Sequence, residues 1–384
     1  MTVSALTRPG ERDRLIVKLS EIDWIFCLAL TLIAAAAIIM QFSIAGSTWM
    51  PWALPTAIRY VVFFVIMIVL SLLDLRVWFA LAYPIYGIGL LLLMAVMVVG
   101  HHALGAQRWL QAGPIQIQPS EIMKIGLVLA LARFYHSASG RTARWSWWLL
   151  WPALLILMPV ALIFKQPDLG TAILVALTGG MVMILGGLSW RVIAAGVLGA
   201  VAMIPPVVMF ALHGYQRARV TSFLDPESDP SGAGYHNLQS AIAIGSGGLL
   251  GKGYGLGSQS QLNFLPEKQT DFIFSSLAEQ FGFVGCVSIL LLYAAVIFMA
   301  LRTAYISHSH FGRLAAAGIT VTFAVSVLIN GAMVMGLAPV VGVPMPLLSY
   351  GGTVMLTVMI GFGLVLAVRV HRYSEVTSGK GSLM

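Results

Sequence analysis

Residues 23–46 read DWIFCLALTLIAAAAIIMQFSIAG, and their only charged residue is Asp23, at the first position. A helix needs about 20 residues to cross the ~30 Å hydrocarbon core of a bilayer, so this stretch is long enough to be a membrane span. Over all 384 residues, 59% are hydrophobic and 9% are charged, whereas a soluble domain has roughly 25% charged residues. The sequence therefore predicts an integral membrane protein.

Apolar runs of similar length recur along the whole chain, separated by charged residues, proline and glycine. They predict ten spans, near residues 23–46, 51–73, 77–100, 119–136, 146–164, 168–188, 190–212, 271–300, 312–338 and 346–369. Backbone polar groups are not left unpaired in lipid, so we expect each span to be a helix. The predicted fold class is an all-α polytopic membrane protein of about ten transmembrane helices, with residues 1–384 forming a single transmembrane domain.

The distribution of Lys and Arg predicts how these spans are oriented, because both residues favour cytoplasmic loops. With the N-terminus inside, the cytoplasmic loops and the two ends contain the majority of the 22 Lys and Arg residues. An even number of spans then places both termini in the cytoplasm. The net charge of +8 follows from this bias and from contact with anionic lipid, and it gives no support to a nucleic-acid partner.

One connection is long: residues about 213–270, between the seventh and eighth spans, form an extracytoplasmic loop in this orientation. Long loops in compact proteins are usually functional or disordered. This loop carries aromatic and aliphatic residues, such as Phe223, Tyr235 and Leu249, in place of a solvating composition. We expect it to fold against the membrane face.

Ionisable residues at membrane depth are candidates for a functional site, and the outer side has four groups of them. In the first group, Arg108 precedes Glu121 and Lys124, which share one face at the start of the fourth span. Glu121 and Lys124 form a structural ion pair in one interpretation; in the other, helix-end N–H groups, Arg108 and Lys124 bind a phosphate. The second group contains Asp168, which is either the N-cap of the sixth span or a carboxylate facing a polar cavity.

The third group is the sequence YQRAR at residues 215–219, where the seventh span meets the long loop. In an extended stretch alternate residues point the same way, so Arg217 and Arg219 would grip one diphosphate. Arginines at an outer interface pair equally well with lipid headgroups, which is the alternative interpretation.

The fourth group, LPEKQTDF at residues 265–272, closes the long loop and opens the eighth span. Thr270 or Asp271 is the N-cap of that helix in one interpretation. In the other, Asp271 is a general base at the mouth of a cavity, because partial desolvation raises the pKa of a carboxyl group. The spacing of the residues does not distinguish the capping interpretation from the general-base interpretation.

The last span is introduced by PVVGVPMPLLSYGG at residues 339–352. Repeated Pro and Gly predict a broken helix, which membranes tolerate only where it is buried in protein or lines a cavity. Asn330, on the preceding span, is expected to face the interior as an interhelical hydrogen-bond donor.

Taken together, these segments resemble the SEDS family (shape, elongation, division and sporulation), and most closely its cell-elongation branch. The resemblance covers nearly the whole chain and lies in Arg108-Trp109 and in residues 118–124, 165–171, 223–235, 265–274 and 340–352. Gln269 stands where the family often has His, which puts a role for that side chain in doubt. Family proteins have ten spans, in agreement with the number expected from the apolar runs.

The resemblance implies a peptidoglycan glycosyltransferase of the cytoplasmic (inner) membrane that polymerises lipid II on a polyprenyl-diphosphate-linked glycan. It also implies a class B penicillin-binding transpeptidase and membrane proteins of the elongation complex as partners. The Asp of the family's Thr-Asp-Phe motif is regarded as catalytic, which carries over to Asp271. The Glu and Lys of its Gln-Pro-Ser-Glu-x-x-Lys motif line a cavity, which carries over to Glu121 and Lys124.

The chemistry of such a reaction requires these residue types. A polyprenyl diphosphate leaves as a dianion, so cations must neutralise it, and a divalent cation, Mg or Mn, is a further candidate for that task. A single displacement that turns an α-linked donor into a β-linked glycan needs one base, here Asp271, by analogy with inverting glycosidases. Candidate substrate-binding residues are Arg108, Glu121, Lys124, Asp168, Arg217, Arg219 and Lys268.

Two other function classes fit the same residues. A lipid II flippase would use the same cavity and cations but would not need Asp271. A non-catalytic scaffold that recruits the transpeptidase would tolerate the loss of every outer charge.

Overall fold

The computed structural model describes residues 15–103, 106–112, 115–138, 147–212, 214–224, 233–262, 264–265 and 267–374. Ten helices of this part of the chain coincide with the ten predicted spans: α2 (Trp24–Ile44), α3 (Ala53–Ser71), α4 (Leu75–Val99), α5 (Pro119–Ala138), α6 (Leu150–Lys165), α7 (Leu169–Leu185), α8 (Trp190–Pro206), α12 (Ile273–Ile306), α13 (His310–Val334) and α14 (Gly352–Val370). Among the described residues, eight helices are long and apolar enough to cross a membrane, and α7 is a shorter apolar helix. The chain is a multi-pass membrane protein.

Polar residues that bound the predicted spans act as helix caps. Asp23 accepts a hydrogen bond from the Phe26 N–H at the start of α2, and Asp74 accepts one from the Arg76 N–H at the start of α4. Ser309 does the same at the start of α13. A side-chain acceptor satisfies one of the four N–H groups that a helix leaves unpaired at its N-terminus, which fixes where each span begins.

The remaining elements are short: α1 (Leu15–Ser20), β1 (His101–Ala103), β2 (Ala106–Ala112), β3 (Ile115–Ile117), η2 (Trp147–Leu149), η3 (Val207–Ala211), α9 (Gly214–Leu224), α10 (Ala233–Ser246) and α11 (Ser258–Gln261). The three strands form one antiparallel sheet in the order β1-β2-β3. It was not expected from the sequence, because strands of three to seven residues leave no period-2 signal long enough to detect. The long connection likewise contains three helices, α9 to α11.

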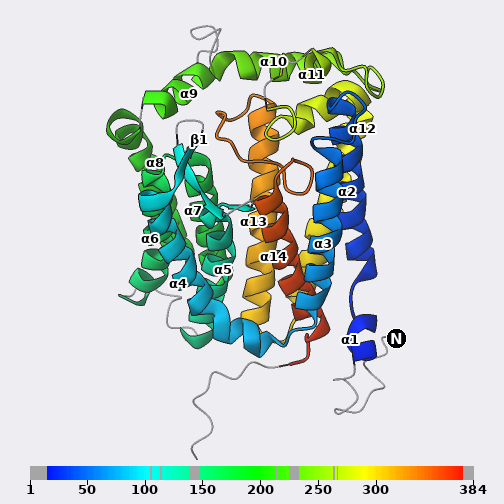
Figure 1. Ribbon diagram of the computed structural model, residues 1–384. Coiled ribbons are helices and arrows are strands. Elements are labelled where there is room, and N and C mark those ends of the chain that lie inside the picture. Colours follow the sequence, from blue (N-terminus) through cyan, green and yellow to red (C-terminus); the bar gives the residue numbers. More distant parts are fainter. Residues whose placement is uncertain are drawn as a thin grey trace, which may run out of the picture.

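Figure 1 shows α9, α10 and α11 crossing one end of the helix bundle, with the N-terminus at the opposite end. We call the end that carries α9 to α11 the loop face. At the other end, Glu21 pairs with Arg372 at 2.6 Å and Asp23 pairs with Arg369 at 3.4 Å. These ion pairs join the beginning and the end of the described chain, so the number of spans between them is even.

The long connection lies on the bundle, as its composition indicates. Ser240, on α10, shares a hydrogen bond of 2.7 Å with Ser275 on α12 and donates another to the Val334 carbonyl at the end of α13. Both contacts are buried, so α10 covers the ends of two membrane helices on the loop face.

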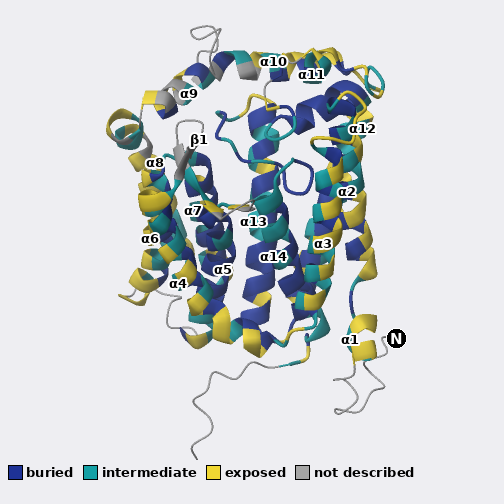
Figure 2. Cartoon of the chain, viewed as in Figure 1, coloured by how far each residue is buried: buried dark blue, intermediate teal, exposed yellow. Residues whose placement is uncertain are grey.

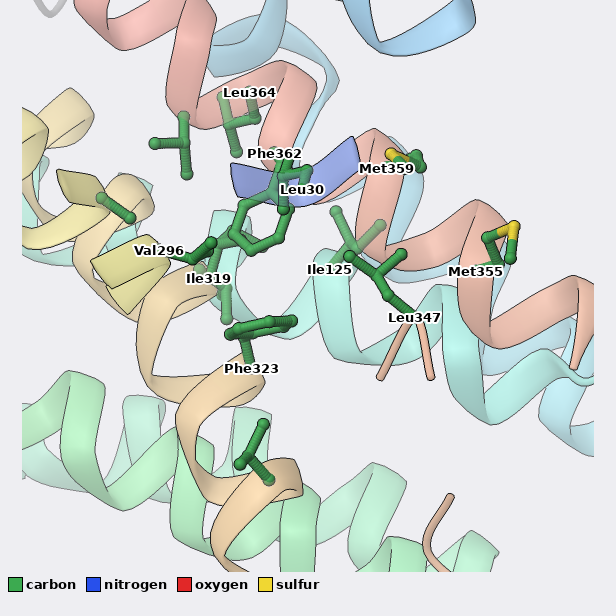
Figure 3. Close-up of a cluster of buried hydrophobic side chains, with 14 of the residues drawn as sticks. Leu30, Ile125, Val296, Ile319, Phe323, Leu347, Met355, Met359, Phe362 and Leu364 are labelled. Atoms are coloured by element: carbon green, nitrogen blue, oxygen red, sulfur yellow. The ribbon is translucent and has the colours of Figure 1, made fainter. Parts of the chain in front are cut away.

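Burial follows the position of each helix in the bundle (Figure 2). In the most apolar stretches of α13 and α14, 56% and 61% of residues are buried, whereas in that of α8 none is. The centre of the core is a cluster of apolar side chains in which the rings of Phe323 and Phe362 meet edge to face at 4.9 Å (Figure 3). Outward side chains such as Phe298 remain exposed and apolar, as expected for surfaces that contact lipid.

Candidate active site

Asp271 lies on the loop face, directly before α12. The N-cap residue of α12 is Phe272, and no side chain caps this helix. The capping interpretation of Thr270 and Asp271 is therefore wrong. The carboxylate of Asp271 instead faces the segment between α13 and α14, because a Cβ atom added to Gly342 would lie 3.6 Å from Asp271 Oδ2.

The charges around Asp271 set its protonation. Burial, and after it the negative charge of Glu267, raise the pKa of Asp271 above its ordinary value of 3.8, and with all effects included the pKa is about 6. The positive charges of Arg219 and Arg108 act in the opposite direction, while Asp168 adds a smaller upward effect. A carboxylate with a pKa close to neutral suits general-base catalysis, since it is ionised at working pH and still holds a proton well.

The segment between α13 and α14 donates hydrogen bonds to the backbone around Asp271. Ser349 Oγ donates to the Thr270 carbonyl at 2.6 Å, and the Tyr350 N–H donates to the Gln269 carbonyl at 2.8 Å. Asn330, on α13, is buried and donates to the backbone of this region, which confirms the expectation that it is an interior hydrogen-bond donor. The broken Pro- and Gly-rich segment therefore forms the wall on which the base rests.

Arg108 and Asp168 meet beside this wall. Arg108 Nη1 lies 3.8 Å from Asp168 Oδ1, and Arg108 Nη2 donates to the Pro167 carbonyl. Asp168 is buried and also accepts from the Thr171 N–H at 3.2 Å, so it caps α7. The N-cap interpretation of Asp168 is therefore confirmed, and its carboxylate also lies near a cation; the interpretation that it faces a polar cavity stays a prediction.

The expectation that residues 215–219 are extended is wrong, because they belong to helix α9. Residues two apart on a helix are rotated by about 200°, so Arg217 and Arg219 do not point the same way. Arg217 is exposed and donates to the Met209 carbonyl at 3.0 Å. Arg219 lines a small recess together with Arg108 and acts electrostatically on Asp271. A joint grip by both arginines is therefore not formed in this structure.

Glu121 and Lys124 form a buried ion pair, with Lys124 Nζ 2.7 Å from Glu121 Oε1 and side-chain exposures of 9% and 6% for Lys124 and Glu121. The second carboxylate oxygen of Glu121 has no hydrogen-bond partner among the described residues. Both side chains line an inner cavity of about 70 Å³, whose wall includes Gly342. The ion-pair interpretation is confirmed, and a role of the pair in binding phosphate stays a prediction.

A larger cavity of about 740 Å³ opens beside the inner one, and Gln118 and Glu121 line both. It is lined mainly by apolar side chains, but it also contains Arg59, whose guanidinium lies over the Tyr350 ring at 5.0 Å. The sequence analysis did not single out Arg59. The available signal was a lone cation within the first two turns of an otherwise apolar span.

The side chain of Lys268 contacts another part of the long connection. Its ammonium group is buried and donates to the Ser260 carbonyl of α11 at 2.6 Å. Desolvation lowers the pKa of Lys268. Lys268 thus joins α11 to the segment that carries Asp271, three residues further on, and direct contact with a substrate stays a prediction.

A second group that the sequence analysis did not single out anchors the same connection. Glu279, on α12, is fully buried and accepts from Lys252 Nζ at 2.8 Å, Ser258 Oγ at 3.1 Å and the Gln259 N–H at 3.0 Å. An acidic residue inside an apolar span was the available signal. This network ties α11 to α12 next to Asp271.

The described residues contain no group of three or more His, Cys, Asp or Glu side chains that could hold a metal ion. Asp168, Asp271 and Glu121 therefore do not form a metal site by themselves. The divalent cation expected from the chemistry of the diphosphate stays a prediction.

Fold and site together define a bundle of membrane helices with a buried carboxylate, Asp271, close to two arginines, and comparison with known proteins identifies its class. Residues 18–374 match the cell cycle protein family of FtsW, RodA and SpoVE. The chain belongs to this family, which is the SEDS family.

The sequence of the chain is similar to those of two named relatives. The chain is 48% identical over 308 residues to peptidoglycan glycosyltransferase MrdB of Escherichia coli (strain K12), covering 80% of this chain and 83% of MrdB. It is 35% identical over 311 residues to a probable peptidoglycan glycosyltransferase, FtsW of Trichlorobacter lovleyi, covering 80% and 81%. Sequence similarity to peptidoglycan glycosyltransferases over most of its length identifies the chain as a glycosyltransferase.

Two solved structures share its fold. One is a chain from a structure described as "Structural coordination of polymerization and crosslinking by a peptidoglycan synthase complex", with a TM-score of 0.81, 34% identity, and coverage of 92% of this chain and 99% of that one. The other is the rod shape determining protein RodA of Thermus thermophilus, with a TM-score of 0.68, 32% identity, and coverage of 92% and 98%.

Proposed function

We propose that this chain polymerises lipid II into glycan strands at the outer face of the cytoplasmic membrane during cell elongation, with Asp271 as the general base. The observation that carries the proposal is the environment of Asp271. Burial is the main cause that raises its pKa to about 6, and Arg108 and Arg219, which line one recess, are near enough to act on it electrostatically. A base and its cations are thus gathered at the mouth of a cleft between membrane helices.

In the proposed reaction, a hydroxyl group of the acceptor sugar attacks the anomeric carbon of the donor. The new glycosidic bond forms as the bond from that carbon to the polyprenyl diphosphate breaks, and the hydroxyl proton passes to Asp271. The diphosphate leaves with the bonding electron pair and is stabilised by the nearby guanidinium groups of Arg108 and Arg219. One base and one displacement predict inversion at the anomeric carbon.

The two cavities suit a lipid-linked substrate. The larger cavity combines apolar walls with Arg59, so it matches a molecule that has a polyprenyl tail and an anionic head. The inner cavity brings the Glu121–Lys124 pair beneath the same wall as Gly342, which faces Asp271. Lys124 would then contact the substrate only if the ligand draws it away from Glu121.

We infer that the loop face is extracytoplasmic and that both termini are cytoplasmic. Lys268, three residues before Asp271, bonds to α11 on the loop face, and the beginning and end of the described chain are joined by ion pairs at the other face. The excess of Lys and Arg at the terminal face supports this orientation through the positive-inside rule.

A class B penicillin-binding transpeptidase and membrane proteins of the elongation complex are the proposed partners. The support is the similarity to a chain from a peptidoglycan synthase complex in which polymerisation and crosslinking are coordinated. A divalent cation, Mg or Mn, is a further proposed ligand of the leaving diphosphate.

The decisive experiment is a polymerisation assay with purified protein, lipid II and the transpeptidase partner. Asp271→Ala is expected to remain folded and to form no glycan, whereas Thr320→Val, at a buried residue of α13 that bonds within its own helix, should retain activity. A parallel reaction with a chelator tests for a divalent cation. Normal rate and strand length from Asp271→Ala would overturn the proposal and leave lipid transport or scaffolding as the function.

A further inference from the structure

Asn330 makes an unusual pair of contacts beneath Asp271. It is on α13, about one turn before the end of that helix at Val334, and its side chain is fully buried. Its Nδ2 group donates one hydrogen bond to the Asp271 carbonyl at 2.9 Å and another to the Val343 carbonyl at 2.8 Å. Both amide hydrogens are thereby used on two segments that are far apart in sequence.

The orientation of the Asn330 amide is fixed by these partners. Both neighbours are carbonyl oxygens, which only accept, so the opposite orientation would place the Asn330 oxygen against two other oxygens. In the observed orientation Asn330 Oδ1 has no hydrogen-bond partner among the described residues. An unpaired buried acceptor is destabilising, so stability alone does not account for an Asn at this position.

The two acceptors belong to the two sides of the site. Asp271 carries the base, and Val343 follows Gly342, the residue that the Asp271 carboxylate faces. Ser349 and Tyr350 hold the preceding residues, Thr270 and Gln269, but in the described part of the chain Asn330 is the side chain that bonds the base residue and the facing wall together.

We propose that Asn330 is a positioning residue for glycosyl transfer, which sets the distance between the Asp271 carboxylate and the Gly342–Val343 wall. The inference rests on the proposed role of Asp271 as base. Asn330 does not touch substrate; it acts on the reaction by fixing the backbone from which the base projects. A change of about 1 Å in the position of a catalytic group lowers rates by roughly 10²-fold, so loss of both hydrogen bonds should reduce kcat on that scale.

The experiment compares Asn330→Leu and Asn330→Asp with the wild-type protein in the lipid II assay. Asn330→Leu removes both hydrogen bonds, whereas a protonated Asp at this position retains one donor, so kcat should fall in the order wild type, Asn330→Asp, Asn330→Leu. KM for lipid II should stay within about twofold. Thr320→Val is the matched control, because Thr320 is buried on the same helix but bonds only within it, to Ala316.

The pH profile distinguishes positioning from general destabilisation. When the backbone loosens, Asp271 gains water, so the acid limb of the rate profile should shift from about pH 6 toward the ordinary carboxyl value of 3.8. Loss of packing alone would lower the amount of active enzyme and leave the acid limb of the rate profile at its wild-type pH. If Asn330→Leu does not fold, Asn330→Asp provides the same readout.

The outcomes separate the two proposals. If Asp271→Asn polymerises lipid II normally, the role of Asp271 fails and the inference fails with it. If Asp271→Asn is inactive while both Asn330 variants keep the wild-type kcat and acid limb, only the positioning role is refuted. A rise in KM with unchanged kcat also overturns it, because Asn330 would then act on binding.

Discussion

Replacing Asp271 by Asn should abolish activity and stabilise the fold. The substitution keeps the shape of the side chain and removes a charge that its surroundings disfavour. Burial first, and then the charge of Glu267, raise the pKa of Asp271 from 3.8 to about 6 against the opposing effects of Arg219 and Arg108. Each tenfold change in proton affinity corresponds to about 1.4 kcal/mol, so the ionised carboxylate destabilises the folded protein by roughly 3 kcal/mol.

The sign of this effect depends on pH. Above about pH 6 the carboxylate is ionised in both the folded and the unfolded protein, and the full destabilisation is present. As the pH falls from 6 toward 3.8, the folded protein takes up the proton first, and the destabilisation disappears. The advantage of Asp271→Asn over the wild type should therefore be largest above pH 6 and shrink below it.

The assay is thermal unfolding of purified protein in detergent, at one pH above 6 and at one pH well below 6. The polymerisation rate is measured alongside it. With about 2 °C per kcal/mol for a chain of this size, the midpoint of Asp271→Asn should rise by up to roughly 6 °C at the higher pH. Glu267→Gln, which removes the neighbouring charge, should give a smaller rise. A midpoint for Asp271→Asn that is unchanged, or equally raised at both pH values, would refute the electrostatic reasoning.

Two further predictions concern the packing around the site. Lys124→Met should lower the free energy of unfolding by about 3 to 5 kcal/mol, because it leaves the buried Glu121 carboxylate without its cation, and the double variant with Glu121→Gln should recover most of the loss in the same thermal assay. Gly170→Ala should cost about 1 to 3 kcal/mol and lower the polymerisation rate, because the added Cβ overlaps the Val341 carbonyl oxygen; an unchanged midpoint and rate would contradict the close packing of α7 on this wall.

The sequence was informative about the fold because the bilayer imposes strong constraints on it. Ten apolar runs became ten helices, and capping residues such as Asp23 and Asp74 mark their starts. The sheet of β1 to β3 and the helices of the long connection were not predicted, because they lie outside the hydrocarbon layer. There, water satisfies an unpaired backbone, and short polar segments carry no comparable constraint.

The site was less predictable because it depends on contacts between distant segments. Asp271 was singled out from the sequence, and its role as base stays a prediction. The spacing of Arg217 and Arg219 was interpreted with the wrong backbone conformation, since five residues do not distinguish an extended stretch from one turn of helix. Arg59 and Glu279 were passed over although each is an ionisable residue inside an apolar span. The partner of Arg59 is Tyr350, and the partner of Glu279 is Lys252. Both partners lie in other segments of the sequence, and only the fold brings each pair together.

In the proposed mechanism, the charges at the site couple proton transfer to departure of the diphosphate. Above pH 6, the two positive charges of Arg108 and Arg219 face three negative charges, those of Glu267, Asp168 and Asp271, so the group carries a net negative charge and offers a dianion no net attraction. When Asp271 accepts the proton of the attacking hydroxyl, one negative charge is removed just as the leaving group gains charge. The cations then act on the diphosphate without competition from the base, so the transition state is stabilised more than the bound substrate, which is the condition for catalysis.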